Sequence, residues 1–266
     1  GSFQPTVKAD SLTYEADQTI TAERAHVGIG HVQPLSLPKF SHRLNLPYIS
    51  YISLTAGYRS SLGVYTEAGL HVPMGDDTKL GGTLGVYTER GVMFGPSGHY
   101  EQVRDGRTVA GDFKSGFIND HGEKLTDILG RSVPENRGYV QWWHNQELAD
   151  HLTLTAQLGY WKDSEVVRDF HPQDFFPIQE PDSFVESTYT GNNYFVSAFA
   201  RVQPNTYHRV QERLPELRFE LSPLALGGGF YQRFNAGVAI LREDPPDGGP
   251  SLLSDRLDGY YAVPRS

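Results

Sequence analysis

The stretch HLTLTAQLGYW, residues 151–161, decides the fold class. Leu152, Leu154 and Leu158 fall on one face of an extended chain, and threonine, glutamine or glycine fills most of the positions between. This period of two is that of a β-strand, because successive side chains of a strand point to opposite faces. The stretch exceeds the usual soluble strand of about five or six residues and matches the 9–11 residues that a tilted strand needs to cross a bilayer.

The same alternation recurs in other parts of the chain. It predicts further strands at 52–60, 62–70, 80–88, 193–203 and 228–240. Glycines interrupt several of these strands, which weakens a soluble sheet but helps a barrel wall to curve. The pattern favours an antiparallel barrel over a soluble β-sandwich and leaves both open.

Charged segments separate these strands and predict long loops. They cover 95–116, 120–138, 162–183 and 242–261, and only SEVVRDFH (164–171) suggests a helical turn or two. Short turns on one side and long loops on the other are typical of outer-membrane barrels.

The N-terminal part has a different organisation. Residues 6–27 predict a β-hairpin with a polar turn at EADQ, within a small unit of residues 1–30. Residues 31–47 carry three prolines and predict an extended connector. The strand-rich portion then covers 48–266.

The composition excludes several functions. A net charge of −9 argues against nucleic-acid binding, because phosphate contacts need clustered Lys and Arg. No cysteine is present, so there is no disulfide or thiolate metal site, and no apolar run is long enough for a transmembrane helix. We expect no cofactor.

Catalytic chemistry receives little support. The ten histidines show no HExxH or i, i+4 pairing and are expected to be scattered on the surface. No GxSxG motif occurs. The acidic residues of the 162–183 segment allow a two-carboxylate glycosidase site, but a solvated acidic face is the better interpretation. These residues are Asp163, Glu165, Asp169, Asp174, Glu180 and Asp182. We therefore expect that the protein is not an enzyme.

Two further features bear on a membrane wall. Trp142, Trp143, Tyr160 and Trp161 would form an aromatic belt at a membrane interface or belong to a core. The stretch ERLPELRFEL predicts a strand that begins at Pro215, with Leu217, Phe219 and Leu221 outward and Arg218 and Glu220 inward.

The order of these segments resembles the LptD/OstA-type lipopolysaccharide assembly proteins of the outer membrane. VKADSLTYEADQTITAERAHV (7–27) is similar to the family's jelly-roll pattern ADxLxYD followed by TAxGxA. The resemblance continues in the segment from LTAGYRSSLG (54–63), in WWHNQELADHLTLTAQLGYWKDSEVVRDF (142–170), and in GNNYFVSAFARVQ followed by YHRVQERLPELRF. Together they cover most of residues 7–260.

The resemblance implies a non-enzymatic outer-membrane transport protein. A short periplasmic β-jelly-roll remnant would pass lipopolysaccharide into an antiparallel barrel, or part of one, which opens laterally toward the outer leaflet. The implied partners are lipopolysaccharide, the outer membrane, a plug lipoprotein and a periplasmic jelly-roll bridge protein. At the family's gate prolines this chain has Leu54 and Gly69, with Pro73 displaced onward, so these three are the candidate gate residues.

Three departures separate the chain from that family. It is too short for the family's barrel of some two dozen strands, its jelly roll is reduced to about one hairpin, and it lacks the family's cysteines. A small porin-like or adhesive barrel and a soluble β-sandwich carbohydrate-binding protein or glycosidase are therefore the alternatives.

Overall fold

The chain forms two compact units. The computed structural model describes residues 5–8, 11–14, 19–29, 32–43, 52–74, 77–123, 125–207, 211–244 and 249–265. The first unit comprises 1–101 and 114–122, and the second comprises 102–113 and 123–266. The described residues confirm an all-β, antiparallel fold, with two short helices.

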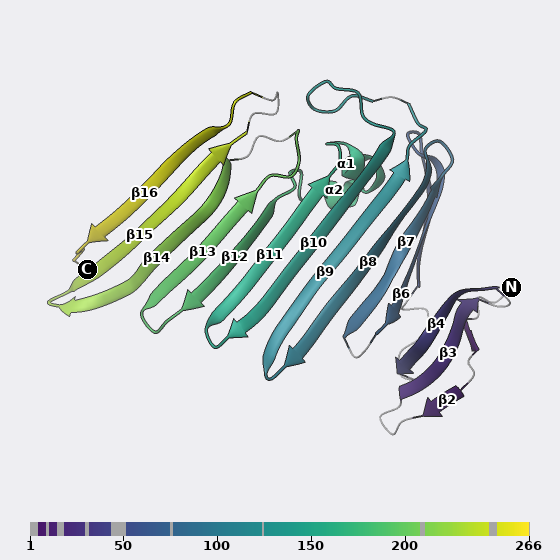
Figure 1. Ribbon diagram of the computed structural model, residues 1–266, viewed down its shortest axis with the longest axis horizontal. Coiled ribbons are helices and arrows are strands. Elements are labelled where there is room, and N and C mark those ends of the chain that lie inside the picture. The colour runs from purple at the N-terminus through teal and green to yellow at the C-terminus, as the bar shows by residue number, and fades with distance from the viewer. Residues whose placement is uncertain are drawn as a thin grey trace. The chain divides into compact units, whose positions relative to one another are not determined.

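A four-stranded sheet opens the chain (Figure 1). Its central strand β3 (Thr19–Ile29) pairs with β1 (Pro5–Lys8) and β2 (Ser11–Tyr14) along one edge and with β4 (Val32–Arg43) along the other. The β2–β3 pairing corresponds to the predicted hairpin, whose first strand is divided into β1 and β2.

The connector predicted at 31–47 is a strand over most of its length. Residues 32–43 form β4, which pairs with β3 only, among the residues that the structure describes. A strand that pairs on one side accommodates proline, because the missing N–H can point away from its neighbour. Pro34 and Pro38 therefore did not prevent pairing, and the prediction of an extended connector in place of a sheet strand was wrong for this part.

Twelve strands then form one antiparallel sheet in simple sequence order, from β5 to β16. In the first half they are β5 (Ile52–Arg59), β6 (Gly63–Pro73), β7 (Thr78–Tyr87), β8 (Gly91–Arg104), β9 (Arg107–Asn119) and β10 (Asn136–Ala149). In the second half they are β11 (Leu152–Trp161), β12 (Ser183–Thr190), β13 (Tyr194–Val202), β14 (Gln211–Gly227), β15 (Phe230–Glu243) and β16 (Leu252–Ala262). All six strands predicted by alternation are confirmed.

The connections differ in length between the two ends of the strands. At one end the strands are joined by short turns, such as 105–106, 150–151 and 228–229. At the other end, 120–135 and 162–182 are long, while 60–62 and 88–90 stay short. We call these the short-turn end and the long-loop end. Helices α1 (Val166–Phe170) and α2 (Pro172–Phe175) belong to the 162–182 loop (Figure 1). Helix α1 confirms the helical turn predicted at 164–171, and α2 follows that stretch.

Two predicted loops contain strands instead. The 95–116 segment lies in β8 and β9, whose turn consists of Asp105 and Gly106 with φ of 53° and 75°. Asp-Gly is a strong signal for a two-residue hairpin, because both positions need positive φ. Most of the second half of the 242–261 segment belongs to strand β16 (Leu252–Ala262).

Pro215 lies inside β14 rather than at its beginning. The strand starts at Gln211, and its pairing with β15 shifts between Arg213 and Glu216. A bulge of this kind is one of the few places where a strand tolerates proline, since no ladder hydrogen bond is required there.

Candidate functional site

One face of β5–β8 is apolar and exposed. Leu54, Ala68, Leu84 and Phe94 are register partners in four successive strands, so their side chains share this face. Leu54 is 67% exposed and Phe94 is 59% exposed. The large exposed apolar side chains of this face are Leu54, Tyr58, Val64, Leu80, Leu84, Val86, Val92 and Phe94. Contiguous apolar surface of this kind marks contact with a membrane or a partner.

The opposite face of the same strands is polar and hydrogen-bonded. The hydroxyl of Tyr87 donates to Oε1 of Glu67 at 2.7 Å, and the Tyr87 ring stacks on that of Tyr65 with centroids 6.0 Å apart. His71 Nε2 lies 2.7 Å from the Ser97 hydroxyl. Tyr87 and Ser97 are buried, whereas the apolar face is exposed. The sheet therefore reverses the usual burial of a soluble protein.

Glycine makes room for the tyrosine rings on this polar face. A Cβ at Gly57 would lie 2.8 Å from the Tyr65 hydroxyl, and one at Gly85 would lie 2.7 Å from the Tyr87 hydroxyl. Such approaches are closer than a real Cβ makes. These two strand glycines thus have a packing role beyond bending the sheet.

The second unit repeats the two-faced arrangement. Leu217, Val238 and Leu257 are register partners on β14–β16 and are 48%, 46% and 85% exposed. Phe219 and Leu221 share their face, as predicted, while Arg218 and Glu220 lie on the opposite one. Other exposed apolar members are Tyr160, Val185, Tyr189, Tyr194, Val202, Ile240 and Tyr261.

The polar face of β14–β16 holds an arginine cluster around one carboxylate. Glu216 is buried and accepts from Arg213 at 2.9 Å and Arg218 at 3.1 Å, and Arg256 lies 3.6 Å away. The register partner between Glu216 and Arg256 is Ala239. Because the Ala239 side chain is small, the Arg256 side chain can extend over β15 toward Glu216.

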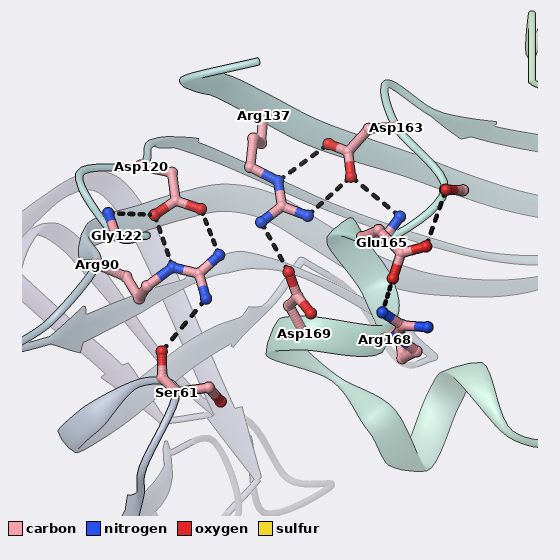
Figure 2. Close-up of polar contacts among 10 residues, drawn as sticks. Ser61, Arg90, Asp120, Gly122, Arg137, Asp163, Glu165, Arg168 and Asp169 are labelled. Carbon is pink, nitrogen blue, oxygen red and sulfur yellow. Dashed lines mark hydrogen bonds and ion pairs between the residues drawn. The ribbon is translucent and has the colours of Figure 1, made fainter. Parts of the chain in front are cut away.

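A buried ion pair fastens the long-loop end of the first unit (Figure 2). Arg90, in the turn before β8, donates through Nε to Asp120 Oδ1 at 2.7 Å and through Nη2 to Oδ2 at 2.5 Å. Its Nη1 donates to the carbonyl of Ser61, and Asp120 also accepts the N–H of Gly122. Such bidentate pairs are strong and geometrically specific.

A second arginine network fastens the 162–182 loop (Figure 2). Arg137, near the start of β10, binds both oxygens of Asp163 at 2.7 and 3.0 Å, and Nη1 donates to Asp169 at 2.8 Å. Its guanidinium also lies 5.5 Å from the centre of the Phe170 ring. The Arg137 side chain is 0% exposed. The pairing therefore compensates two carboxylates that the loop brings out of water.

Apolar packing and further hydrogen bonds complete this loop. Trp161, Val166, Val167 and Phe170 are almost fully buried. The side chain of Asn205 accepts the Trp161 N–H and donates to the carbonyl of Gly159, both at 2.8 Å.

The acidic residues of this loop form only in part the solvated face that the sequence suggested, since Glu180 is exposed and Asp174 and Asp182 are half-buried. Asp163 and Glu165 are buried, and Glu165 pairs with Arg168. The nearby Tyr207 hydroxyl has a raised pKa, first because of burial and then because of the negative charge of Asp163. It stays protonated at physiological pH.

Another carboxylate organises the 120–135 loop. Asp127 accepts from the side chain of Arg131 at 3.0 Å and from the backbone N–H groups of Leu129 and Arg131. Burial opposes ionisation, but these hydrogen bonds outweigh it and lower the pKa of Asp127.

The three candidate gate residues lie in β5 and β6. Leu54 is on the exposed apolar face and faces Ala68 across the two strands. Gly69 pairs with Ser53, and a Cβ there would meet the Ser53 hydroxyl. Pro73 is the last residue of β6 and pairs with Lys79. Among the described residues β5 is at one end of the strand order of the sheet, and the gate assignment stays a prediction.

The four candidate belt aromatics divide between the two faces. Trp142 and Tyr160 lie on the apolar face, where Trp142 pairs with Leu158 and Tyr160 with Val140. Trp143 and Trp161 lie on the opposite face. Trp161 is 1% exposed and contacts the Phe175 ring of α2, with centroids 6.0 Å apart. The assignment of these four residues to a membrane interface stays a prediction.

The sequence interpretation missed the arginines that organise the structure. Arg90 and Arg137 carry no local motif, because their partners Asp120 and Asp163 lie 30 and 26 residues along the chain. No group of three or more metal-ligating side chains occurs in the described part of the chain.

No model of a known protein family matches the sequence, and a comparison with curated proteins finds no relative. Within the described residues, no helix has the length and apolarity needed to span a membrane.

Proposed function

We propose that this chain is part of an outer-membrane β-barrel protein that delivers lipopolysaccharide to the outer leaflet without catalysing a reaction. The observation that carries the membrane part of the proposal is the reversed burial of the large sheet. Large apolar side chains such as Leu54 and Leu257 are exposed, while Tyr87, Ser97 and Glu216 are buried on the other face. This is the side-chain arrangement of a barrel wall with lipid outside and a polar lumen inside.

Strand lengths and connections support the same proposal. Strands such as β6, β7 and β11 have 11, 10 and 10 residues, which is the length for crossing a bilayer with tilt. Short turns at one end and long loops at the other are the outer-membrane arrangement, in which the short turns face the periplasm. The chain enters β5 at the short-turn end, so the N-terminal sheet would be periplasmic.

The lipopolysaccharide part rests on the motif order. Under this proposal the N-terminal sheet receives the lipid, and a plug lipoprotein occupies the lumen. Strands β5 and β6, with Leu54, Gly69 and Pro73, form one side of a lateral gate. Strand β5 pairs only with β6 among the described residues, which suits a strand whose other edge opens.

The exposed face argues against a soluble β-sandwich. In a sandwich the side chains of Leu217, Val238 and Leu257 would form the core against a second sheet. They are instead 48%, 46% and 85% exposed. A porin-like barrel shares the reversed burial, so the lipid-transfer experiment must separate it from the proposed function.

The first test is sedimentation of the purified chain with and without detergent. We expect a monodisperse species only in detergent, because the apolar face needs a covering layer. A monodisperse species in plain buffer would contradict the membrane assignment.

The second test measures transfer of fluorescent lipopolysaccharide into vesicles that contain the chain. Vesicles that contain an unrelated small porin are the control. We expect transfer above that control when the implied partners are added, and transfer equal to the control would leave only the porin-like alternative.

A further inference from the structure

Aromatic rings lie on the polar face of β10–β13, where lipid contact does not explain them. Trp143 and Phe184 belong to one register row, with Gln157 between them. Trp143 is 40% exposed on this face. Phe184 stacks on Phe199 of the next strand, with centroids 5.7 Å apart. Side chains that face a polar lumen are usually small or hydrophilic. An exposed aromatic surface at such a position therefore indicates a ligand that itself has apolar faces.

Two arginines extend the same row. Phe184 pairs with Arg201, and Arg201 pairs with Arg213. Both guanidinium groups lie near the Phe199 ring, 5.5 and 5.8 Å from its centre. The Nε atom of each is buried and has no hydrogen-bond acceptor among the described residues. A ligand cannot reach these buried Nε atoms, but the side chains of Arg201 and Arg213 are 29% and 31% exposed. Since arginine has five donors in a fork that suits carboxylate and phosphate, the exposed part of each side chain can bind an anion.

Carboxylates lie among these cations. Asp182 pairs with Arg201 at 2.8 Å and Glu216 with Arg213 at 2.9 Å, and Glu186 is the register partner of Phe199. A bare anion would be repelled by these groups. A ligand that offers hydroxyl donors to the carboxylates and anionic acceptors to the arginines would satisfy both.

We propose that this row binds an acidic oligosaccharide. The saccharide row consists of Trp143, Gln157, Phe184, Arg201 and Arg213, and it spans four strand spacings, or about 19 Å, which is long enough for several sugar units. Sugar C–H faces pack on the aromatic rings, hydroxyl groups bind the amide and carboxylates, and a phosphate or carboxylate binds the arginines. The proposal deepens the proposed function and rests on it for the source of the saccharide.

The test is isothermal titration calorimetry on the full chain in detergent. The probe is the phosphorylated saccharide obtained by removing all acyl chains from lipopolysaccharide, and the comparison ligands are maltoheptaose and inorganic phosphate. We expect binding of the phosphorylated saccharide and at least tenfold weaker binding of the other two. Equal binding of maltoheptaose would remove the role of the arginines, and equal binding of phosphate would reduce the row to a simple anion site.

Adjacent tryptophans supply the matched control. Trp143→Ala and Arg213→Gln should each weaken saccharide binding at least tenfold, while Trp142→Ala, on the apolar face, should leave it unchanged. Circular dichroism and urea midpoints check that each variant is folded. If neither of the first two variants is folded, Gln157→Ala is the milder substitution. It should weaken saccharide binding several-fold.

Full affinity in a folded Trp143→Ala variant, or no heat from the wild-type chain, would overturn the proposal. Its failure can be told from failure of the proposed function. The saccharide titration does not depend on lipid transfer, and sedimentation without detergent does not depend on saccharide.

Discussion

Replacing Arg137 with methionine should destabilise the second unit far more than a comparable change at the surface. The substitution keeps much of the aliphatic volume and removes the guanidinium. Arg137 makes three bonds to Asp163 and Asp169, whose side chains are only 3% and 11% exposed. After the change both carboxylates are buried without their cation.

The size of the effect follows from that burial. Breaking a buried ion pair by removing one partner costs about 3–5 kcal/mol, because the remaining charge stays uncompensated. A loss of about 4 kcal/mol changes the unfolding equilibrium constant roughly a thousandfold, at about 1.4 kcal/mol per factor of ten. Arg131→Met is the control. Arg131 is 48% exposed, and Asp127, although only 8% exposed, would keep its hydrogen bonds from the backbone N–H groups of residues 129 and 131. Ion pairs with an exposed partner contribute only about 0–1 kcal/mol.

Urea unfolding in detergent micelles, followed by tryptophan fluorescence, measures both variants. The free energy of unfolding should fall by about 3 kcal/mol more for Arg137→Met than for Arg131→Met. Adding Asp163→Asn and Asp169→Asn to the Arg137 variant should restore part of the loss, because neutral amides leave no unpaired charge. An equal effect of the two arginine substitutions would refute the reasoning.

Three further predictions address the two faces and the 120–135 loop. Leu84→Arg should block insertion into vesicles, since Arg on a lipid-facing position costs about 2–4 kcal/mol at mid-membrane. The control Thr83→Arg, on the other face, should insert, and equal insertion of the two variants would contradict the face assignment. Gly85→Val should lower the urea midpoint because its Cβ would clash with Tyr87, and a Gly85→Val/Tyr87→Ala double variant should recover stability. Since the pKa of Asp127 is lowered, its stabilisation is present at neutral pH and is lost as pH falls through that lowered value. Protease cleavage of the loop should therefore rise only in acid, and Asp127→Asn should remove this pH dependence.

Side-chain alternation made much of the fold predictable. Where apolar residues recur at every second position, as in 152–161, the period identifies the strand and the exposed apolar face together. In β8 the alternation is hidden, because the run Gly95, Pro96, Ser97 and Gly98 is typical of a turn. The Asp105-Gly106 turn was the local signal that could have identified this hairpin.

The ion pairs of Arg137 could not be predicted from the sequence, because they join residues that are distant along the chain. Arg137 and Asp163 are 26 residues apart, and Arg137 and Asp169 are 32 apart. Their contact depends on how the 162–182 loop folds back, which no period of two or 3.6 encodes. The acidic residues therefore looked solvated. The same limit hid the contact of Glu216 with Arg256, which become neighbours only once β14, β15 and β16 are in register.

The short turns have a consequence for how the sheet is built. The turns at 105–106, 150–151 and 228–229 have two residues each, so closing them costs little conformational entropy. Each of these hairpins can therefore form from its turn outward. Contacts of this local kind form quickly, whereas β9 to β10 and β11 to β12 must first bring together strands separated by 16 and 21 residues of loop (120–135 and 162–182). Assembly would proceed hairpin by hairpin, with its slow steps at the junctions that Arg90 and Arg137 later fasten.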